Sequence, residues 1–377
     1  DFGIATGGEF GGLGLEVGME DGLVKVVSPI EDTPAYRAGI KPGDLITQLD
    51  GVSVKGLTIG DAIKKMRGKP DTQIKLSILR KGEAGLVEIT LTRAIIKNPS
   101  VKYKLTDSGY PYVRITQFQE HTGQDLAKAL ATIVEKTEGP LKGLVLDLRN
   151  NPGGLVVSAV SVSAAFLKKD SLVVYSDGKT PDSKMRLFAN PRNYIGPDSR
   201  DDYLKDLPPE MKTVPMVVLV NAGSASAAEI VSGALQDHGR AKVLGTQSFG
   251  KGTIQTLLPL SNGSAVKLTV ARYFTPSGRS IQAKGITPDF IVEDPAITPE
   301  EDAKLRRESS LANHLANSKE VLDKDKQHAN VANIEKEPAR TQFADSGQFE
   351  AGTEKDFQYS QAINLLKGLE VTKVKAK

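Results

Sequence analysis

Ser226 and Lys251 are the residues of this chain whose types and spacing point most directly to chemistry. Ser226 lies in the small-residue run 221–229, and Lys251 lies in the glycine-flanked run 249–255. A serine hydroxyl is a poor nucleophile at neutral pH unless a general base takes its proton. A lysine amine can do this when burial removes its water and lowers its pKa. Serine with lysine is a recognised variant of the serine triad, so the two runs predict nucleophilic catalysis.

The position of Ser226 relative to the expected elements supports this role. Residues 217–220 form a continuous apolar run typical of a buried strand, and residues 227–235 predict the helix after it. A serine at a helix start lies among backbone N–H groups without helical partners, which is what a tetrahedral oxyanion needs. The alternative is structural, because residues 226–229 also fit a capping box in which the serine only satisfies the first turn.

Lys251 lies in a segment with extended character, so Lys251, Thr253 and Gln255 are expected on one face. The Gln255 amide can then hydrogen-bond the lysine amine and direct it at the serine. The alternative is an ordinary surface lysine. Gly250 and Gly252 argue against it, because glycines on both sides indicate a close approach of backbone.

The composition excludes several other kinds of site. The 377 residues include no cysteine, which excludes disulfides, thiolate metal sites and cysteine nucleophiles. The four histidines lack metal-ligand spacing, so neither a metal nor a cofactor is expected. A net charge of only +3 does not indicate nucleic acid as a partner. No apolar run approaches the ~20 residues of a membrane span.

A phosphate-binding loop is the rival interpretation of residues 245–252, which nearly match its pattern. Gly252 stands where a serine or threonine would hold magnesium, and the residues after it predict a strand instead of the required helix. The sequence therefore disfavours an ATPase.

Residues 13–93 predict a small β-rich module with two helices. Period-two alternation between turn residues predicts strands at 13–17, 23–27, 44–49, 73–80 and 85–93. Apolar spacing predicts helices at 34–39 and 58–66.

This module resembles a PDZ domain, most clearly over residues 38–46 and the turn at 50–51. Gly12, Leu13, Gly14 and Leu15 stand where that family's carboxylate-binding loop lies. The resemblance implies that their N–H groups hold a peptide C-terminus while the peptide adds a strand to the sheet. The alternative is that the two glycines only make a tight turn.

From residue 112 the pattern becomes one of alternating strands and helices. The expected strands are 113–115, 143–148, 172–175, 217–220 and 266–274, and the expected helices are 122–136, 158–167 and 227–235. Residues 177–212 are polar and predict a surface insertion. Further on, residues 298–318 are expected to be helical, and 320–353 are polar enough to be mobile in part. Residues 357–369 carry an apolar stripe expected to dock on the core or on a partner subunit.

Taken together, these motifs resemble the carboxyl-terminal processing peptidases, also called tail-specific proteases, over about residues 9–295. In that family the nucleophile is the second serine of a Ser-Ala-Ser-Ala segment, and the lysine follows it by 25 positions. Here 251 minus 226 is 25, which selects Ser226 over Ser224. The resemblance gives Gln255 the orienting role, and residues 146–155 supply an oxyanion donor. We assign the oxyanion hole to the N–H groups of Gly154 and Ala227.

The resemblance implies an α/β multidomain fold and an activity. We expect a PDZ domain at 9–95, a peptidase core with a mixed sheet flanked by helices at 96–295, and a charged helical C-terminal region at 296–377 as a candidate oligomerisation element. The implied function is serine endopeptidase cleavage at or near flexible protein C-termini, with the PDZ domain engaging the tail or gating the site. The family also implies a periplasmic location, self-assembly and, in some members, a separate adaptor protein. The chain begins at Asp1 without methionine, which is compatible with a removed signal peptide.

A second function, from a different class, is a catalytically silent scaffold that binds C-terminal peptides through its PDZ domain. Retention of Ser226, Lys251 and Gln255 together argues against it. Covalent labelling of Ser226 by a serine-reactive probe separates the two functions.

Overall fold

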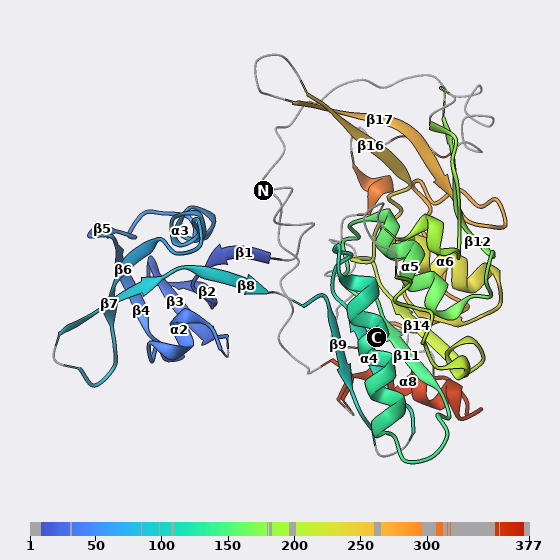
Figure 1. The fold of residues 1–377 in the computed structure, drawn as a ribbon, viewed down its shortest axis with the longest axis horizontal. Helices are drawn as coiled ribbons and strands as arrows, with labels where there is room; N and C mark the ends of the chain where they lie inside the picture. The colour runs from blue at the N-terminus through green and yellow to red at the C-terminus, as the bar shows by residue number, and fades with distance from the viewer. Residues whose placement is uncertain are drawn as a thin grey trace. The chain divides into compact units, whose positions relative to one another are not determined.

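The computed structural model divides the chain into two compact units, residues 1–98 and 99–377 (Figure 1). The structure describes residues 9–372 except 31, 84, 98, 107–108, 179, 181–182, 196–200, 260–264, 296–306, 312–314, 316, 318–350 and 354. Each unit has apolar clusters of its own, so each is described by itself.

In its described residues, the first unit is a sheet with two short helices. Its strands are β1 (Glu9–Gly12), β2 (Leu15–Glu20), β3 (Leu23–Pro29), β4 (Leu45–Leu49), β5 (Val52–Ser53), β6 (Gln73–Leu79), β7 (Leu86–Thr92) and β8 (Ala94–Lys97). The main sheet has the order β2-β3-β4-β6-β7, β5 pairs with β4, and β1 pairs with β8. Helices α2 (Pro34–Arg37) and α3 (Ile59–Met66) cover a core in which Val24, Ile46 and Leu76 are fully buried.

The predicted strands and helices of the PDZ-like module are confirmed to within a few residues. Turn chemistry explains this agreement, because Asp21, Asp50 and Gly51 adopt positive φ at the tight turns that separate the strands. Strands β1 and β8 were not expected, since their pairing joins residues more than 80 positions apart.

The second unit contains a six-stranded mixed sheet with the order β18-β15-β14-β11-β10-β9. Its strands are β9 (Val101–Lys104), β10 (Tyr112–Ile115), β11 (Leu144–Asp147), β14 (Met216–Val220), β15 (Lys242–Gly245) and β18 (Phe290–Ile291). All neighbouring pairs are parallel except β9 with β10. Parallel strands place their carboxyl ends at one edge of the sheet, so the loops after β11 and β14 meet there.

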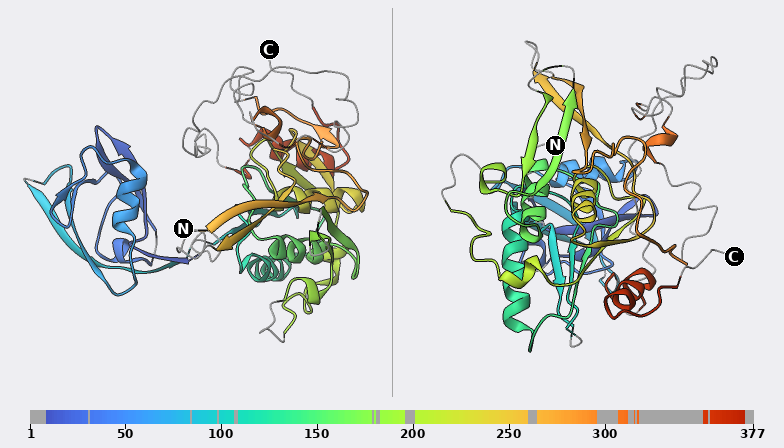
Figure 2. Two further views of the ribbon diagram at one scale, coloured as in Figure 1. Left: turned by 90° about the horizontal axis from the view of Figure 1, so that it is seen from above. Right: turned by 90° about the vertical axis from the view of Figure 1, so that its right-hand side faces the viewer.

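Helices cover both faces of this sheet. Helices α4 (Thr122–Lys136), α5 (Val156–Phe166) and α6 (Ala227–Asp237) pack on one face, and α8 (Phe357–Leu366) packs on the other. Figure 2 shows α8 and α4 on opposite sides of the strands. Side chains alternate between the two layers, with Leu144 and Leu146 in the first cluster and Val145 in the second. The expected α/β core with a mixed sheet is confirmed.

A second, antiparallel sheet has the order β13-β12-β17-β16. Its strands are β12 (Leu172–Gly178), β13 (Arg186–Phe188), β16 (Thr253–Pro259) and β17 (Ala265–Phe274), and β16 with β17 forms the long hairpin in Figure 1. Residues 177–212, expected as a surface insertion, are only partly peripheral. Tyr194 and Met211 are buried in the main cluster, beside the 3-10 turns Pro191–Asn193 and Pro209–Lys212. Their burial was not predicted because the residues around them in the sequence are mostly polar.

The C-terminal expectations have mixed outcomes. Within 298–318, where a helix was expected, the described residues include the 3-10 turn Glu308–Ser310, and the remaining positions mostly lie outside the described residues. The mobile segment expected at 320–353 also lies almost entirely outside them. Helix α8 docks on the core against β11, β14 and β15, which is one of the two alternatives left open by its apolar stripe.

Candidate functional site

Ser226 lies where buried strand β14 turns into helix α6. Every residue of β14 is buried, and α6 begins at Ala227, directly after the serine. The backbone of Ser226 has φ 53° and ψ −111°, a conformation that is rare for a residue with a side chain. Such strain persists only where surrounding contacts impose it, and it is concentrated at functional sites.

Ser224 and Ser226 differ in the way their side chains are placed. Ser224 is fully buried, and its Oγ donates to the carbonyl oxygen of Leu148 at 2.8 Å and accepts from the Asn221 amide at 3.0 Å. Ser226 is only partly buried. Ser224 therefore holds the turn to the loop after β11, whereas Ser226 is the serine that solvent or a substrate can reach.

Glu229 binds the serine segment to the lysine segment. One carboxylate oxygen, Oε2, accepts from the amides of Ser226 at 2.8 Å and Lys251 at 2.9 Å. The other, Oε1, accepts from the Ser248 hydroxyl at 2.6 Å and the Gly250 amide at 2.7 Å. Both candidate dyad residues thus have their backbone amides on one oxygen atom.

The environment of Glu229 is dry. Its side chain is fully buried, and burial raises the pKa of Glu229 to about 7 although the four donors act to lower it. One of the two hydrogen bonds of the expected capping box is present: the Ser226 amide donates to the carboxylate of Glu229, three residues further along. Capping and placement of a nucleophile therefore coexist at this helix start.

The glycines beside Lys251 allow a close backbone approach, as expected. A Cβ on Gly252 would lie 2.3 Å from the amide nitrogen of Gln282, and one on Gly250 would lie 3.1 Å from the carbonyl carbon of Ala283. The Gly252 amide donates to the Gln282 side chain at 3.0 Å. The lysine segment is thus clamped on two sides, and Lys251 itself is partly buried.

Gln255 lies in strand β16, four residues after the lysine. Its side chain is exposed, and the pairing of β16 with β17 is irregular between Ile254 and Gln255. A bulge interrupts the alternation of side chains on which the expected common face depended.

The loop 148–155 brings the glycine pair to the serine. A Cβ on Gly153 would lie 2.8 Å from Ser226 Cβ and 3.0 Å from the Ala227 nitrogen. The Gly153 amide donates to Asn151 Oδ1 at 2.9 Å. The amides of Gly154 and Ala227 donate in none of the hydrogen bonds among the described residues. Ala227 directly follows the serine, and Gly154 directly follows the glycine that packs on it, so both predicted oxyanion donors have amides without a partner among the described residues.

In the first unit, the expected peptide loop precedes an edge strand. Gly14 has φ 79°, and a Cβ there would lie 2.2 Å from Thr33 Cβ, so this glycine is required by the turn. The amides of Leu13 and Gly14 donate in none of the hydrogen bonds of the described residues. Strand β2, which begins at Leu15, is at the edge of its sheet, so the geometry is open to an added strand.

Two further kinds of site are absent from the ranges that the structure describes. No helix there is both long and apolar enough to cross a bilayer. No group of three or more histidine, aspartate or glutamate side chains there could hold a metal ion.

Comparisons with known proteins agree with this architecture. The sequence profile of peptidase family S41 matches residues 109–292, and that of the PDZ domain matches residues 25–80. The carboxy-terminal-processing protease of Bartonella bacilliformis is 44% identical over 369 residues, which cover 97% of this chain and 76% of that protein. The carboxy-terminal processing protease CtpB of Bacillus subtilis is 37% identical over 76% of this chain and 56% of its own length.

Among solved structures, that of the photosystem II D1 C-terminal processing protease is similar to this chain. It is 31% identical with a TM-score of 0.43, over 80% of this chain and 77% of that one. This chain spans about half the length of several curated relatives that it matches.

Proposed function

Because this chain belongs to peptidase family S41, whose members named above are C-terminal processing proteases, we propose that it cleaves proteins at or near flexible C-termini through a Ser226/Lys251 dyad. The observation that carries the proposal is the buried Glu229 carboxylate. It accepts from the backbone amides of both residues on one oxygen, which supports a site built from these two segments.

In the proposed mechanism, neutral Lys251 takes the proton of the Ser226 hydroxyl as the oxygen attacks a peptide carbonyl. The amides of Gly154 and Ala227 donate to the oxyanion that forms, and the positive end of helix α6 adds to this stabilisation. The lysine then gives its proton to the leaving amine, and the acyl-enzyme remains. Lysine next takes a proton from water as the water oxygen attacks the ester, and it returns that proton to the Ser226 oxygen when the acid product leaves.

Gln255 is the proposed orienting residue for the lysine amine. It lies near the start of β16, four residues after Lys251 on the same segment, and the proposed role requires its amide to reach the lysine amine when substrate is bound. Its exposure leaves the side chain free to respond to a bound substrate.

Substrate tails are proposed to bind first to the PDZ domain. The open amides of Leu13 and Gly14 suit a terminal carboxylate, and the edge of β2 suits the strand that precedes it. We infer a periplasmic location and a homo-oligomeric state from the family, with an activating adaptor as a further candidate partner. Neither nucleic acid nor a metal has a role in this proposal.

The experiment that tests the dyad is proteolysis of casein, a disordered protein, by the purified chain. Ser226→Ala and Lys251→Ala are expected to abolish turnover, because each removes one half of the proton transfer, at a cost of about 10⁴-fold or more. Circular dichroism should show an unchanged fold.

Ser232→Ala is the matched control on the same helix. Its hydroxyl bonds only to carbonyl oxygens of α6 itself, so turnover should be retained. Peptidase activity that survives in both dyad variants would refute the assignment. A wild-type chain that binds tails but neither cleaves casein nor reacts with a fluorophosphonate would be the silent scaffold instead.

A further inference from the structure

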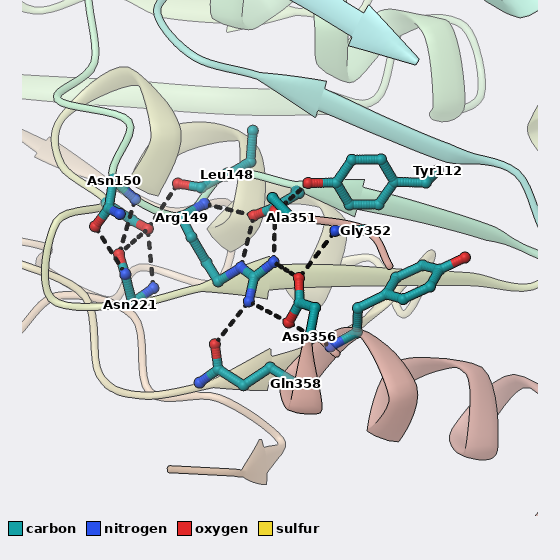
Figure 3. A network of polar contacts seen from close by, with 12 residues as sticks. Tyr112, Leu148, Arg149, Asn150, Asn221, Ala351, Gly352, Asp356 and Gln358 are labelled. Atoms are coloured by element: carbon teal, nitrogen blue, oxygen red, sulfur yellow. Dashed lines mark hydrogen bonds and ion pairs between the residues drawn. The ribbon is translucent and has the colours of Figure 1, made fainter. Parts of the chain in front are cut away.

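A buried ionic cluster joins the C-terminal segment to the loop that carries the oxyanion glycines. Arg149 follows strand β11 and leads into the loop 148–155, and Asp356 lies 207 positions away as the N-cap of α8. Figure 3 shows the Arg149 guanidinium facing the side chains of Asp356 and Gln358. Asp147, Arg149, Asp356 and Gln358 are all at most 5% exposed.

The guanidinium of Arg149 uses every donor it has. Its Nε and Nη2 donate to Asp147 at 3.0 and 2.7 Å. Its Nη1 donates to Asp356 Oδ1 at 2.9 Å and to Gln358 Oε1 at 3.0 Å, and its Nη2 also donates to Asp356 Oδ2 at 2.5 Å. A planar fork that is paired on two edges leaves the side chain no alternative position.

Asp356 is equally fixed from its own side. Its Oδ1 accepts from the Tyr359 amide at 3.1 Å, which caps α8, and its Oδ2 accepts from the Gly352 amide at 3.0 Å. The helix that it begins is held on the sheet by Tyr359 and Ala362, both buried. The anchor of Arg149 is therefore a rigid element and not a loose tail.

The backbone after Arg149 passes this constraint to the catalytic centre. Asn150 exchanges hydrogen bonds with Asn221 of the serine turn, at 2.9 Å in each direction. The Asn151 carbonyl accepts from the Ala225 amide at 2.9 Å, directly before the nucleophile. Gly153 then packs against Ser226 itself. Arg149, Asn150, Asn151 and Gly153 are thus each held by a named contact.

We propose that Asp356 is a positioning residue of the peptidase site, which acts through Arg149 to hold the loop 148–155 with its glycine amide at Ser226. The inference rests on the proposed function, since the loop is assigned there as the oxyanion donor. Oxyanion stabilisation requires donors within a few tenths of an ångström of their place, so a small relaxation of the loop lowers kcat more than KM.

The decisive variant is Asp356→Asn in the full chain. Asparagine caps a helix about as well as aspartate, so α8 stays in place while Arg149 loses one of its two carboxylate partners and keeps Asp147. We expect kcat on casein to fall about 10- to 100-fold with KM unchanged. Deuterium uptake in peptides that cover 148–155 should rise.

Ala362→Gly is the matched control. It weakens the same helix in the same buried cluster but makes no contact with the guanidinium, so the melting temperature should fall while kcat and loop exchange stay as in wild type. A kcat for Asp356→Asn within twofold of wild type overturns the inference, and so does an equal loss of kcat in Ala362→Gly.

Hydrogen exchange and catalysis test the positioning role and the proposed function separately. If wild type neither cleaves casein nor labels at Ser226, the proposed function is wrong, and unchanged exchange of 148–155 in Asp356→Asn then overturns the coupling as well. If wild type is active and Asp356→Asn has the kcat and the loop exchange of wild type, the positioning role is wrong and the proposed function stands.

Discussion

Glu229 determines, at the scale of single residues, how the candidate dyad is assembled. A fully buried carboxylate costs free energy unless its oxygens are satisfied. Here two oxygens accept four hydrogen bonds, three of them from backbone amides of the serine and lysine segments. The two amides on Oε2 suit the ionised form, because a proton on that oxygen displaces one of them. The protonation of Glu229 is therefore linked to the geometry of the site.

Stability and activity should respond to pH in opposite directions at this residue. Burial raises the pKa of Glu229 from 4.5 to about 7, so the folded chain binds the extra proton between those values. A carboxyl with a raised pKa contributes less stability as pH rises through this window. Turnover, which needs the ionised form, should instead fall as pH drops below about 7.

The measurement is kcat against pH for wild type and Glu229→Gln. The amide cannot accept at both ends, so the variant should be slower at every pH, and the part of the acidic limb near pH 7 that belongs to Glu229 should be absent. An identical acidic limb in the variant would assign it to another group.

Two loops that follow neighbouring parallel strands form the site at the scale of elements. The loop after β11 supplies the glycine pair, and the turn after β14 supplies the serine. They touch because parallel strands end at one edge of the sheet. Gly153 lies at one close approach of the two loops, with φ 98° and no room for a Cβ beside Ser226.

Gly153→Ala should lower kcat by about 100-fold or more, because the added methyl group must displace the nucleophile or the helix start. Gly139→Ala is its control. That glycine also has a positive φ, 82°, but no atom lies within 4 Å of the place that a Cβ would take, so the variant bears the backbone strain without a clash. Equal effects of the two substitutions on kcat would show that strain alone is responsible.

At the scale of the whole molecule, the described residues form three apolar clusters, one in the first unit and two in the second. The PDZ core consists only of residues 13–91, and the peptidase clusters consist only of residues from 101 onwards. The proposed dyad, the proposed oxyanion loop and the Asp356 anchor all belong to the second unit. We therefore propose that tail binding and cleavage reside in units that each have their own source of stability.

Removing residues 1–98 tests this division. With a pair of peptides that differ only in a free or amidated C-terminus, the full chain should show a kcat/KM at least about tenfold higher for the free acid, since a carboxylate held by backbone amides is lost on amidation. Residues 99–377 should retain labelling of Ser226 and show no such preference. A preference that persists after the removal would place recognition of the carboxylate in the peptidase unit.

The local elements were largely predictable from sequence, because they depend on short-range rules. Alternation and turn residues predicted β3, β4 and β6, and helical apolar spacing predicted both ends of α4. The small strands β8, β15 and β18 were not predicted, since their partners lie far away in the chain and their own residues carry a weak pattern. The burial of Tyr194 and Met211 was not predicted either, because the segment around them is polar.

The sequence by itself determined which chemistry is available: one serine at a helix start, one lysine between glycines, a glycine pair, and no cysteine. Only the tertiary structure decided what joins them. Glu229 bonds to the lysine segment 22 positions away, and Asp356 bonds to Arg149 at a separation of 207 positions. Neither pairing could be predicted from the spacing of residues in the sequence. A buried charge is tolerated only where the fold brings it partners, and pairing between distant segments is a property of the packed chain.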